Sequence, residues 1–376
     1  MALGTKTIGL TIGKFMPLTK GHECMIELAA SQLDELYIIV SSTQEQDFSS
    51  KLSLHVRYEI IKKKYAGRNI TVIKCVDAIG PPKCADMYGT ASEEHFWKYW
   101  VDIFRITCPD ATHFVSSDRY GAQAAKRLNI EWFAVDPERD LMDITATQVR
   151  ADPIKHWKYI SREFRPHYVK RVVVVGPESA GKSTLVKDLG KAWGSPAVPE
   201  YGRTMTTIVT SPDNKNYSNT WHISDFHKIL DRQQAMNTFA AMESDNGFIF
   251  IDSDALTTWL YAAEYLNAYS NILKKAYQQE KFDLVVLVKP DIPWVDDGTR
   301  TMSDSVKRQR FFNLLLEHHV IAEHIILEAT DRNERVDEVL TKITEVLMPE
   351  KLKNYDAVFS DLTKQDASLT LNTEDG

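Results

Sequence analysis

The 376-residue sequence has few cysteines, no long apolar run and no excess of positive charge, and each shortage excludes a class of protein. Its four cysteines, Cys24, Cys75, Cys84 and Cys108, show no C-x-x-C spacing, so we expect neither a zinc site nor a disulfide framework. No 18-residue apolar run is present, which argues against a membrane protein. A net charge of −7 without a basic tail argues against nucleic acid as the main partner.

The first residues, MALGTKTIGLTIGKF, lack the basic segment and the small-residue cleavage site of a secretory signal, and they are more typical of a first strand. We therefore expect a cytoplasmic protein. With 43% hydrophobic and 26% charged residues, the composition matches ordinary globular domains. A chain of 376 residues is longer than one hydrophobic core usually holds, so we expect two domains.

Apolar, strand-like runs alternate with helical patterns along most of the chain. This order predicts an α/β fold with two doubly wound parallel sheets, a Rossmann-like N-terminal domain and a C-terminal P-loop domain. The aromatic and basic stretch HWKYISREFRPHYVKR separates the two series. We predict domains over residues 1–165 and 166–348, followed by a polar tail over 349–376.

A phosphate-binding loop is predicted at residues 176–184, GPESAGKST, which match G-x-x-x-x-G-K-[ST] between the strand RVVVV and a helix. Glycines let backbone N–H groups surround phosphate oxygens, Lys182 places a charge on the β and γ phosphates, and Ser183 ligates Mg²⁺. A chance match in a tight turn is the alternative, and the flanking context disfavours it.

Two further strand ends carry candidate groups for the phosphoryl acceptor. The run FIFIDSD places Asp252 and Asp254 at a strand tip, where one carboxylate can serve the Mg²⁺ shell and the other can accept a hydroxyl proton. The run PEYGR offers Glu200 and Arg203, which suit a polyol and a phosphate. Solvated loop carboxylates are the alternative interpretation.

The segment PWVDDGTR resembles a lid that carries Arg300 over the transferring phosphoryl group. For Lys307 and Arg308, which follow, a charged helix face fits better. Trp294 can stack on a planar ring or simply pack beside its neighbouring proline.

A second loop, GKFMPLTKGH at residues 13–22, follows the strand TIGLTI but fits neither a dinucleotide fingerprint nor a P-loop. Thr19 and His22 lie one turn apart at a helix N-terminus, with Lys14 nearby, and form a compact donor set for phosphate oxygens. The stretch ITATQVR at the far end of the same domain adds hydroxyls and the guanidinium of Arg150.

These motifs resemble known families. The first 165 residues or so resemble the nucleotidylyltransferases, with their (H/T)xGH and ISxTxxR signatures, and the GKFxPxxxGH form with SSDRYGAQAAKRLN resembles nicotinamide mononucleotide adenylyltransferases. GPESAGKS, EYGR, FIDSD and WVDDGTR are together similar to the ribosylnicotinamide kinase domain of the bifunctional NadR proteins. Thr19 stands where NadR members usually have histidine, and Thr145 replaces the usual serine.

The resemblance implies two consecutive ATP reactions. The kinase domain phosphorylates nicotinamide riboside to nicotinamide mononucleotide (NMN), and the other domain transfers AMP from ATP to NMN, which yields NAD and pyrophosphate. Mg²⁺ is the implied cofactor, held by Ser183 and Asp252. The DNA-binding extension of some NadR repressors is missing, so we expect no nucleic-acid partner and no membrane partner; a homo-oligomer is left open.

The resemblance also implies roles for individual residues. Catalytic residues are Lys14, Thr19, His22, Arg150, Lys182, Asp252 and Asp254. ATP-binding residues are Gly13, Phe15, Gly21, Thr145, Thr147, Gly176, Glu178, Ser179, Ala180, Gly181, Ser183, Thr184 and Arg300. Substrate-binding residues are Trp97, Trp100, Asp118, Arg119, Glu200, Tyr201, Arg203, Trp294 and Asp297; for Trp97 and Trp100 core packing at helical spacing is equally compatible.

Two alternatives compete with this interpretation. A fusion of phosphopantetheine adenylyltransferase with dephospho-coenzyme A kinase would share both fold types, but EYGR and WVDDGTR do not favour it. A nucleotide-sensing protein with one degenerate site is disfavoured by Lys182 and Ser183 in one domain and by His22 and Arg150 in the other.

Overall fold

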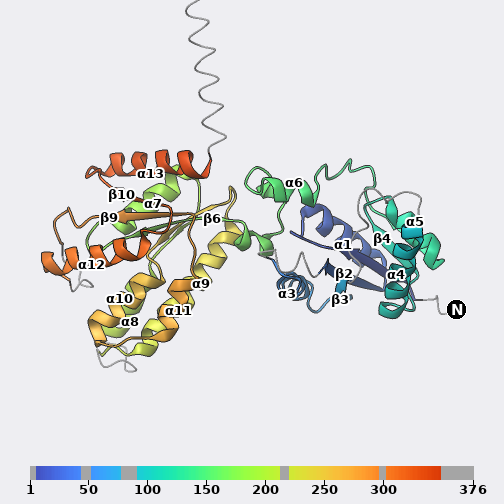
Figure 1. Ribbon diagram of the computed structural model, residues 1–376, viewed down its shortest axis with the longest axis horizontal. Helices are drawn as coiled ribbons and strands as arrows, with labels where there is room; N and C mark the ends of the chain where they lie inside the picture. Colours follow the sequence, from blue (N-terminus) through green and yellow to red (C-terminus); the bar gives the residue numbers. More distant parts are fainter. Residues whose placement is uncertain (1–5, 44–51, 78–90, 212–219, 296–301, 349–376) are drawn as a thin grey trace, which may run out of the picture. The chain divides into compact units, whose positions relative to one another are not determined.

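The computed structural model describes residues 6–43, 52–77, 91–211, 220–295 and 302–348. The chain divides into two compact units, Met1–Tyr168 and Val169–Gly376, each built around its own sheet (Figure 1). The predicted tail at 349–376 lies outside the described residues. No helix in the described part of the chain is both long and apolar enough to cross a membrane.

The first unit contains a five-stranded sheet in the order β3-β2-β1-β4-β5, and its neighbouring strands pair in parallel. Its strands are β1 (Ile8–Gly13), β2 (Glu35–Thr43), β3 (Ile70–Asp77), β4 (His113–Ser116) and β5 (Glu131–Ala134). Its helices are α1 (Lys20–Gln32), α3 (Leu54–Lys64), α4 (Ala91–Thr107), α5 (Tyr120–Leu128), α6 (Ala146–Ala151), η2 (Trp157–Tyr159) and η3 (Arg162–His167). The chain order reverses between β1 and β4, which is where ligands bind in open parallel sheets.

The second unit contains another five-stranded parallel sheet, in the order β10-β9-β6-β8-β7. Its strands are β6 (Lys170–Val175), β7 (Ala197–Val198), β8 (Phe248–Asp252), β9 (Leu284–Val288) and β10 (His324–Leu327). Its helices are α7 (Lys182–Trp193), α8 (Tyr201–Thr210), α9 (Ile223–Glu243), α10 (Ala255–Leu266), α11 (Asn271–Gln279), α12 (Ser305–His319) and α13 (Arg332–Leu347). Figure 1 shows α7 and α13 on one face of this sheet and α12 on the other.

Continuous apolar strands explain this layered architecture. Every residue of β8 and β9 is buried, as expected for strands covered by helices on both faces. The predicted α/β class with two doubly wound parallel sheets is confirmed. In each sheet the carboxyl ends of the central strands lie next to a loop that the sequence singles out, GKFMPLTKGH after β1 and GPESAGKST after β6.

Candidate active sites

The first unit holds a cavity of about 520 Å³ at the carboxyl ends of β1 and β4. Residues predicted from both ends of the domain meet there. The cavity is lined by Gly13, Lys14, Phe15, Thr19, Gly21, His22, Asp118, Thr145, Thr147 and Arg150, among others. The loop after β1 and the ITATQVR segment, more than 120 residues apart, therefore form one site.

Thr19 and His22 form a capping box at the N-terminus of α1. The backbone N–H of Thr19 donates to His22 Nδ1 over 3.1 Å, and the Thr19 hydroxyl caps the backbone N–H of His22. Because Nδ1 accepts a bond, the neutral ring carries its proton on Nε2. Burial lowers the pKa of the imidazole to about 4, so the ring is neutral at pH 7 and offers Nε2–H as a donor.

Lys14 and Arg150 are two of the cations that line this cavity. Arg150 donates to Met16 O and to Thr147 Oγ1, both over 2.8 Å, and so connects α6 to the first loop. Burial, with the charge of Arg150 as the second cause, lowers the pKa of Lys14. Cations crowded in this way are typical of a site that binds a polyanion such as a triphosphate.

Asp118 and Arg119 are neighbours in the sequence, but they differ in whether they line this cavity. Asp118 lines the cavity and pairs with Arg139 over 2.8 Å, whereas Arg119 pairs with Glu138 at the surface and is not among the lining residues. Arg139 also lines the cavity, and its Nη1 donates to Ile144 O over 3.1 Å. Arg139 was not predicted from the sequence, because no motif surrounds it.

Trp97 and Trp100 belong to the hydrophobic core of the first unit. They are 8% and 7% exposed, and Trp100 stacks on Phe104 with ring centroids 5.8 Å apart. Neither lines the cavity at β1 and β4. Of the two interpretations that the helical spacing allowed, this packing supports the core.

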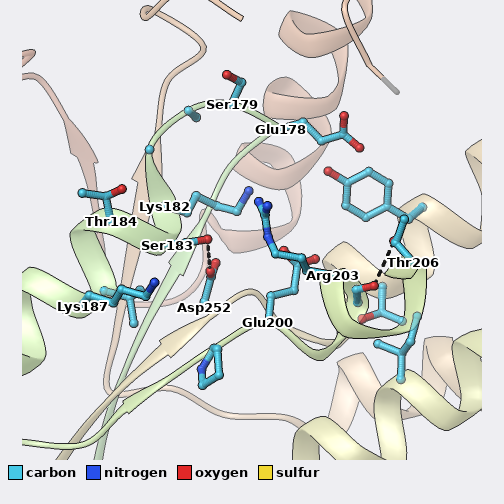
Figure 2. Close-up of a pocket in the computed structure, with 18 of the residues that line it drawn as sticks. Glu178, Ser179, Lys182, Ser183, Thr184, Lys187, Glu200, Arg203, Thr206 and Asp252 are labelled. Atoms are coloured by element: carbon cyan, nitrogen blue, oxygen red, sulfur yellow. Dashed lines mark hydrogen bonds between the residues drawn. The ribbon is translucent and has the colours of Figure 1, made fainter. Parts of the chain in front are cut away.

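The second unit holds a cavity of about 450 Å³ above the carboxyl ends of β6 and β8 (Figure 2). It collects most of the predicted kinase residues. The lining includes Glu178, Ser179, Ala180, Gly181, Lys182, Ser183, Thr184, Glu200, Arg203 and Asp252. Figure 2 shows the side chains of Lys182, Arg203 and Asp252 directed into the same part of the cavity.

The loop between β6 and α7 has the conformation that phosphate binding requires. Ser179 and Gly181 have positive φ angles of 61° and 88°, which fold the backbone into a concave turn. Gly176 has no room for a side chain, because a Cβ there would lie 2.6 Å from Val288 O. Lys182 is buried at the start of α7, where its Nζ donates to Pro177 O over 3.1 Å.

Two carboxylates lie beside this loop, the buried Asp252 and the half-buried Glu200. The hydroxyl of Ser183 donates to Asp252 Oδ2, while Asp252 Oδ1 is buried without a hydrogen-bond partner. Burial raises the pKa of Asp252, and burial together with the charge of Asp252 raises the pKa of Glu200 to about 7. A hydroxyl and an orphaned carboxylate oxygen side by side are ligands that suit Mg²⁺.

No group of three or more His, Cys, Asp or Glu side chains that could hold a metal ion occurs among the described residues. A P-loop magnesium site does not need one, because Mg²⁺ there is held by one hydroxyl, one carboxylate and the phosphates of the ligand.

Asp254 takes a different place from Asp252, although only one residue separates them. Its side chain caps α10 by accepting from Thr257 N over 2.8 Å, and it lies 2.9 Å from His319 Nε2. Burial opposes ionisation here, but the bond and charge of His319 hold the pKa of Asp254 below its usual range. Asp254 is not among the residues that line the cavity.

An aromatic wall that no sequence motif marks forms part of the lining of this cavity. It consists of Trp221, Phe226, Tyr261 and Tyr265. Trp221 lies 5.2 Å from Phe226 and 5.8 Å from Tyr265 between ring centroids. Tyr265 also donates to Glu178 Oε1 over 3.3 Å, which connects the wall to the phosphate loop. The wall offers flat apolar surface to a planar ring.

The remaining predicted kinase residues lie elsewhere. Tyr201 stands outside the lining, with the guanidinium of Arg232 5.3 Å from its ring centroid. Trp294 is also outside the lining; the adjacent Val295 N donates to Ser179 Oγ over 3.0 Å. Asp297 and Arg300 lie outside the described residues.

Comparisons with known proteins agree with two nucleotide sites. A model described as "Cytidylyltransferase-like" matches residues 10–152, and one described as "AAA domain" matches residues 171–335. The chain is similar to the "Trifunctional NAD biosynthesis/regulator protein NadR" of Salmonella typhimurium and of Escherichia coli. Identity is 31% over 327 and 328 residues respectively, and each match covers 83% of this chain and 76% of the relative.

Solved structures share the fold of this chain. A NadR protein in complex with NR and one in complex with NAD and AMP-PNP match with TM-scores of 0.70 and 0.69. Each is 23% identical to this chain, and each match covers 91% of this chain and 96% of the solved one. At this identity the likeness supports the fold.

Proposed function

Because this chain belongs to the NadR family, we propose that it makes NAD in two ATP-dependent steps, one in each unit. The second unit phosphorylates nicotinamide riboside to NMN, and the first transfers AMP from a second ATP to NMN. The observation that carries the proposal is the presence, in one chain, of a P-loop cavity and a Thr-x-Gly-His cavity. ATP, nicotinamide riboside, NMN and NAD are the proposed ligands.

In the kinase cavity, the phosphate loop and Lys182 bind the β and γ phosphates of ATP. Ser183 and the orphaned oxygen of Asp252 are the proposed Mg²⁺ ligands. When bound, Mg²⁺ neutralises charge on the phosphates. The nicotinamide ring packs against the aromatic wall, and this places the ribose between the wall and Glu200.

We assign Glu200 as the base that accepts the proton of the ribose 5′-hydroxyl. A hydroxyl is too weak an acid to ionise unaided, and a pKa of about 7 suits a group that gains and loses a proton at neutral pH. The freed oxygen forms a bond to the γ phosphorus, and the bond between that phosphorus and the β–γ bridging oxygen breaks. Arg203 faces the charge that develops on the phosphoryl group.

The adenylyl transfer needs no base, because the phosphate of NMN is already ionised at pH 7. Its oxygen attacks the α phosphorus of ATP, and the bond to the β phosphate breaks to release pyrophosphate. Neutral His22 donates from Nε2 to the α phosphate, while Lys14, Thr147 and Arg150 stabilise the departing negative charge.

The test is to incubate the protein with nicotinamide riboside, Mg²⁺ and ATP, and to follow NMN and NAD by chromatography. Wild type is expected to form both. Lys182→Ala and Glu200→Gln should each slow phosphorylation roughly 10²–10³-fold. His22→Ala should let NMN accumulate, because it impairs only the second step. Exposed Lys191, on the same helix as Lys182, gives the matched control Lys191→Ala.

Formation of neither product would contradict the proposed substrates. Dephospho-coenzyme A and phosphopantetheine would then be supplied, since the coenzyme A pathway fusion is the nearest rival. If Glu200→Gln were as active as wild type, Glu200 would not be the base.

A further inference from the structure

Three arginines are almost fully buried, yet they line neither cavity. Arg57, Arg308 and Arg335 are 1%, 4% and 6% exposed. Burying a guanidinium is costly unless hydrogen bonds compensate for the lost water. All three donate to backbone carbonyls, several of which belong to the two phosphate loops, and Arg335 also pairs with the Asp291 carboxylate over 2.8 Å.

The loop of the kinase cavity is held by two of them, each from a different helix. Arg308 of α12 donates from Nε to Glu178 O over 3.1 Å and makes a longer contact of 3.4 Å to Ser179 O. Arg335 of α13 donates from Nη1 to Ala180 O over 3.0 Å. Three consecutive carbonyls of the loop therefore point towards buried guanidinium groups.

Because the peptide unit is planar and trans, holding the carbonyls on one side of the loop also fixes the direction of the backbone amides on the other side. In such a peptide the C=O of one residue and the N–H of the next point in opposite directions. Carbonyls held outwards at residues 178–180 direct the amides of Ser179, Ala180 and Gly181 inwards, and all three residues line the cavity. Inward amides are the groups that bind phosphate oxygens.

The loop of the first cavity is held in a similar way. Arg57 of α3 donates from Nη1 to Lys14 O and to Ser41 O, the latter over 3.0 Å, and from Nε to Leu52 O over 2.9 Å. The guanidinium of Arg57 thus connects the loop after β1 to the end of β2 and to the residues just before α3. Phe15, whose amide follows the held carbonyl, has a φ of 46° and lines the cavity.

We infer that Arg57, Arg308 and Arg335 are positioning residues that fix the backbone of the two ATP-binding loops from the side opposite the ligand. Arginine suits this task better than lysine, since its rigid guanidinium presents several donors in fixed directions and keeps its charge when buried. The inference rests on the proposed function for the identity of the bound nucleotide, but its geometry concerns only the loops.

The experiment compares Arg308→Met, Arg335→Met and Arg57→Met, with both activities measured on the same preparation. Arg308→Met and Arg335→Met should raise the KM for ATP in phosphorylation roughly tenfold, the effect of one lost charged hydrogen bond. The KM for nicotinamide riboside and the rate of adenylyl transfer should change by less than about twofold. Arg57→Met should show the reverse pattern, with adenylyl transfer impaired and phosphorylation preserved.

Matched variants separate positioning from general stability. Arg332 lies on α13 like Arg335, but its side chain is 68% exposed and pairs with Asp188, so Arg332→Met should change neither activity. The lysine variants Arg308→Lys and Arg335→Lys retain the charge with fewer donors and should recover only part of the loss. They also provide the test if a methionine variant does not fold.

Two results would overturn the inference. One is an unchanged KM for ATP in folded variants. The other is an equal loss of both activities with a lower melting temperature, which would indicate a purely structural role. AMP-PNP binding by calorimetry is measured in parallel. If the wild type binds AMP-PNP but forms no product, the proposed function fails, while a selective loss of one AMP-PNP site in the variants still supports the inference.

Discussion

His22 serves two purposes at the start of α1. Its Nδ1 accepts from Thr19 N and caps the N-terminus of the helix, and its other nitrogen is left as a donor beside the cavity. A capping interaction thus fixes the tautomer that the chemistry needs. Thr145 and Gln148 form a second capping box at α6, so both helix starts at this cavity are set by contacts three residues apart.

The lowered pKa of His22 predicts a specific pH dependence of stability. The imidazole titrates at 6.5 in the unfolded chain and at about 4 in the folded protein. Between these values the unfolded chain binds more protons, so the free energy of unfolding should fall as the pH drops from 6.5 towards 4 and stay unaffected above 6.5. The full loss is about 3 kcal/mol, at about 1.4 kcal/mol per pH unit.

Thermal unfolding of wild type and His22→Gln at pH values between 4 and 8 measures this effect. Glutamine keeps a capping acceptor but does not titrate, so the variant should lose less stability below pH 6.5 than wild type. Identical pH profiles for the two proteins would contradict the prediction.

Motif residues predicted from the sequence line the two cavities, whereas the lining residues outside motifs were not anticipated. Lys182, Ser183 and His22 are recognisable because a short local pattern fixes both their backbone and their chemistry. The aromatic wall has no such pattern, since Trp221 and Tyr261 meet only when α9 and α10 pack together. The helical spacing of Trp97 and Trp100 is compatible with both core packing and a binding surface, so the sequence did not decide between the two.

At the level of elements, the turn between β8 and α10 places two nearby carboxylates in different environments. Asp252 is the last residue of β8 and lines the cavity, whereas Asp254 caps the following helix. Ser253 between them has a φ of 69°, and this turns the chain away from the strand direction. The sequence placed both aspartates at the strand tip, but it could not show this turn.

Asp254→Asn tests the capping role. Asparagine can still accept from Thr257 N but leaves the buried His319 without its anionic partner, so stability should fall by about 1–3 kcal/mol. At a temperature where the variant stays folded, its rate of phosphorylation should match wild type within about threefold, because the side chain lines no cavity. Denaturant unfolding and kinase assays measure the two effects.

Asp252→Asn is the matched comparison, since it is the same change of residue type two positions earlier. It should abolish phosphorylation without a comparable loss of stability. If Asp254→Asn instead lost activity while remaining fully stable, the carboxylate would act in the reaction itself.

Elements with long apolar runs were predicted correctly, and short ones less so. The run PEYGR was expected to end a short strand, and the strand there is only two residues long, Ala197–Val198, with α8 beginning at Tyr201. The prolines at 196 and 199 lack the N–H that a longer strand would need. The nine-residue helix α11 was not predicted, because it is short and only Leu273 is buried along it.

At the level of the whole molecule, each unit has its own sheet, its own core and its own cavity. The segment HWKYISREFRPHYVKR, which was expected to mark a boundary, carries buried Trp157, Ile160 and Phe164. Ile160 also bridges to Thr19, so this segment supports the first cavity. The many basic residues of this segment gave no sign of that burial.

Separate cavities predict that a ligand of one unit stabilises that unit alone. Nicotinamide riboside at about 100 times its Kd should stabilise the second unit by about 2.7 kcal/mol. Hydrogen exchange should slow in β6 and β8 and remain unchanged in β1 and β4, where the other cavity lies. Equal slowing in all four strands would contradict the assignment of nicotinamide riboside to the P-loop cavity.

The separation of the cavities also has a genetic consequence. The described contacts that shape each cavity come from within its own unit, so an inactivating substitution in one unit leaves the other site intact. Two defective alleles, one encoding Lys182→Ala and the other His22→Ala, should therefore complement each other in a cell that depends on this route to NAD. Two alleles defective in the same unit should not.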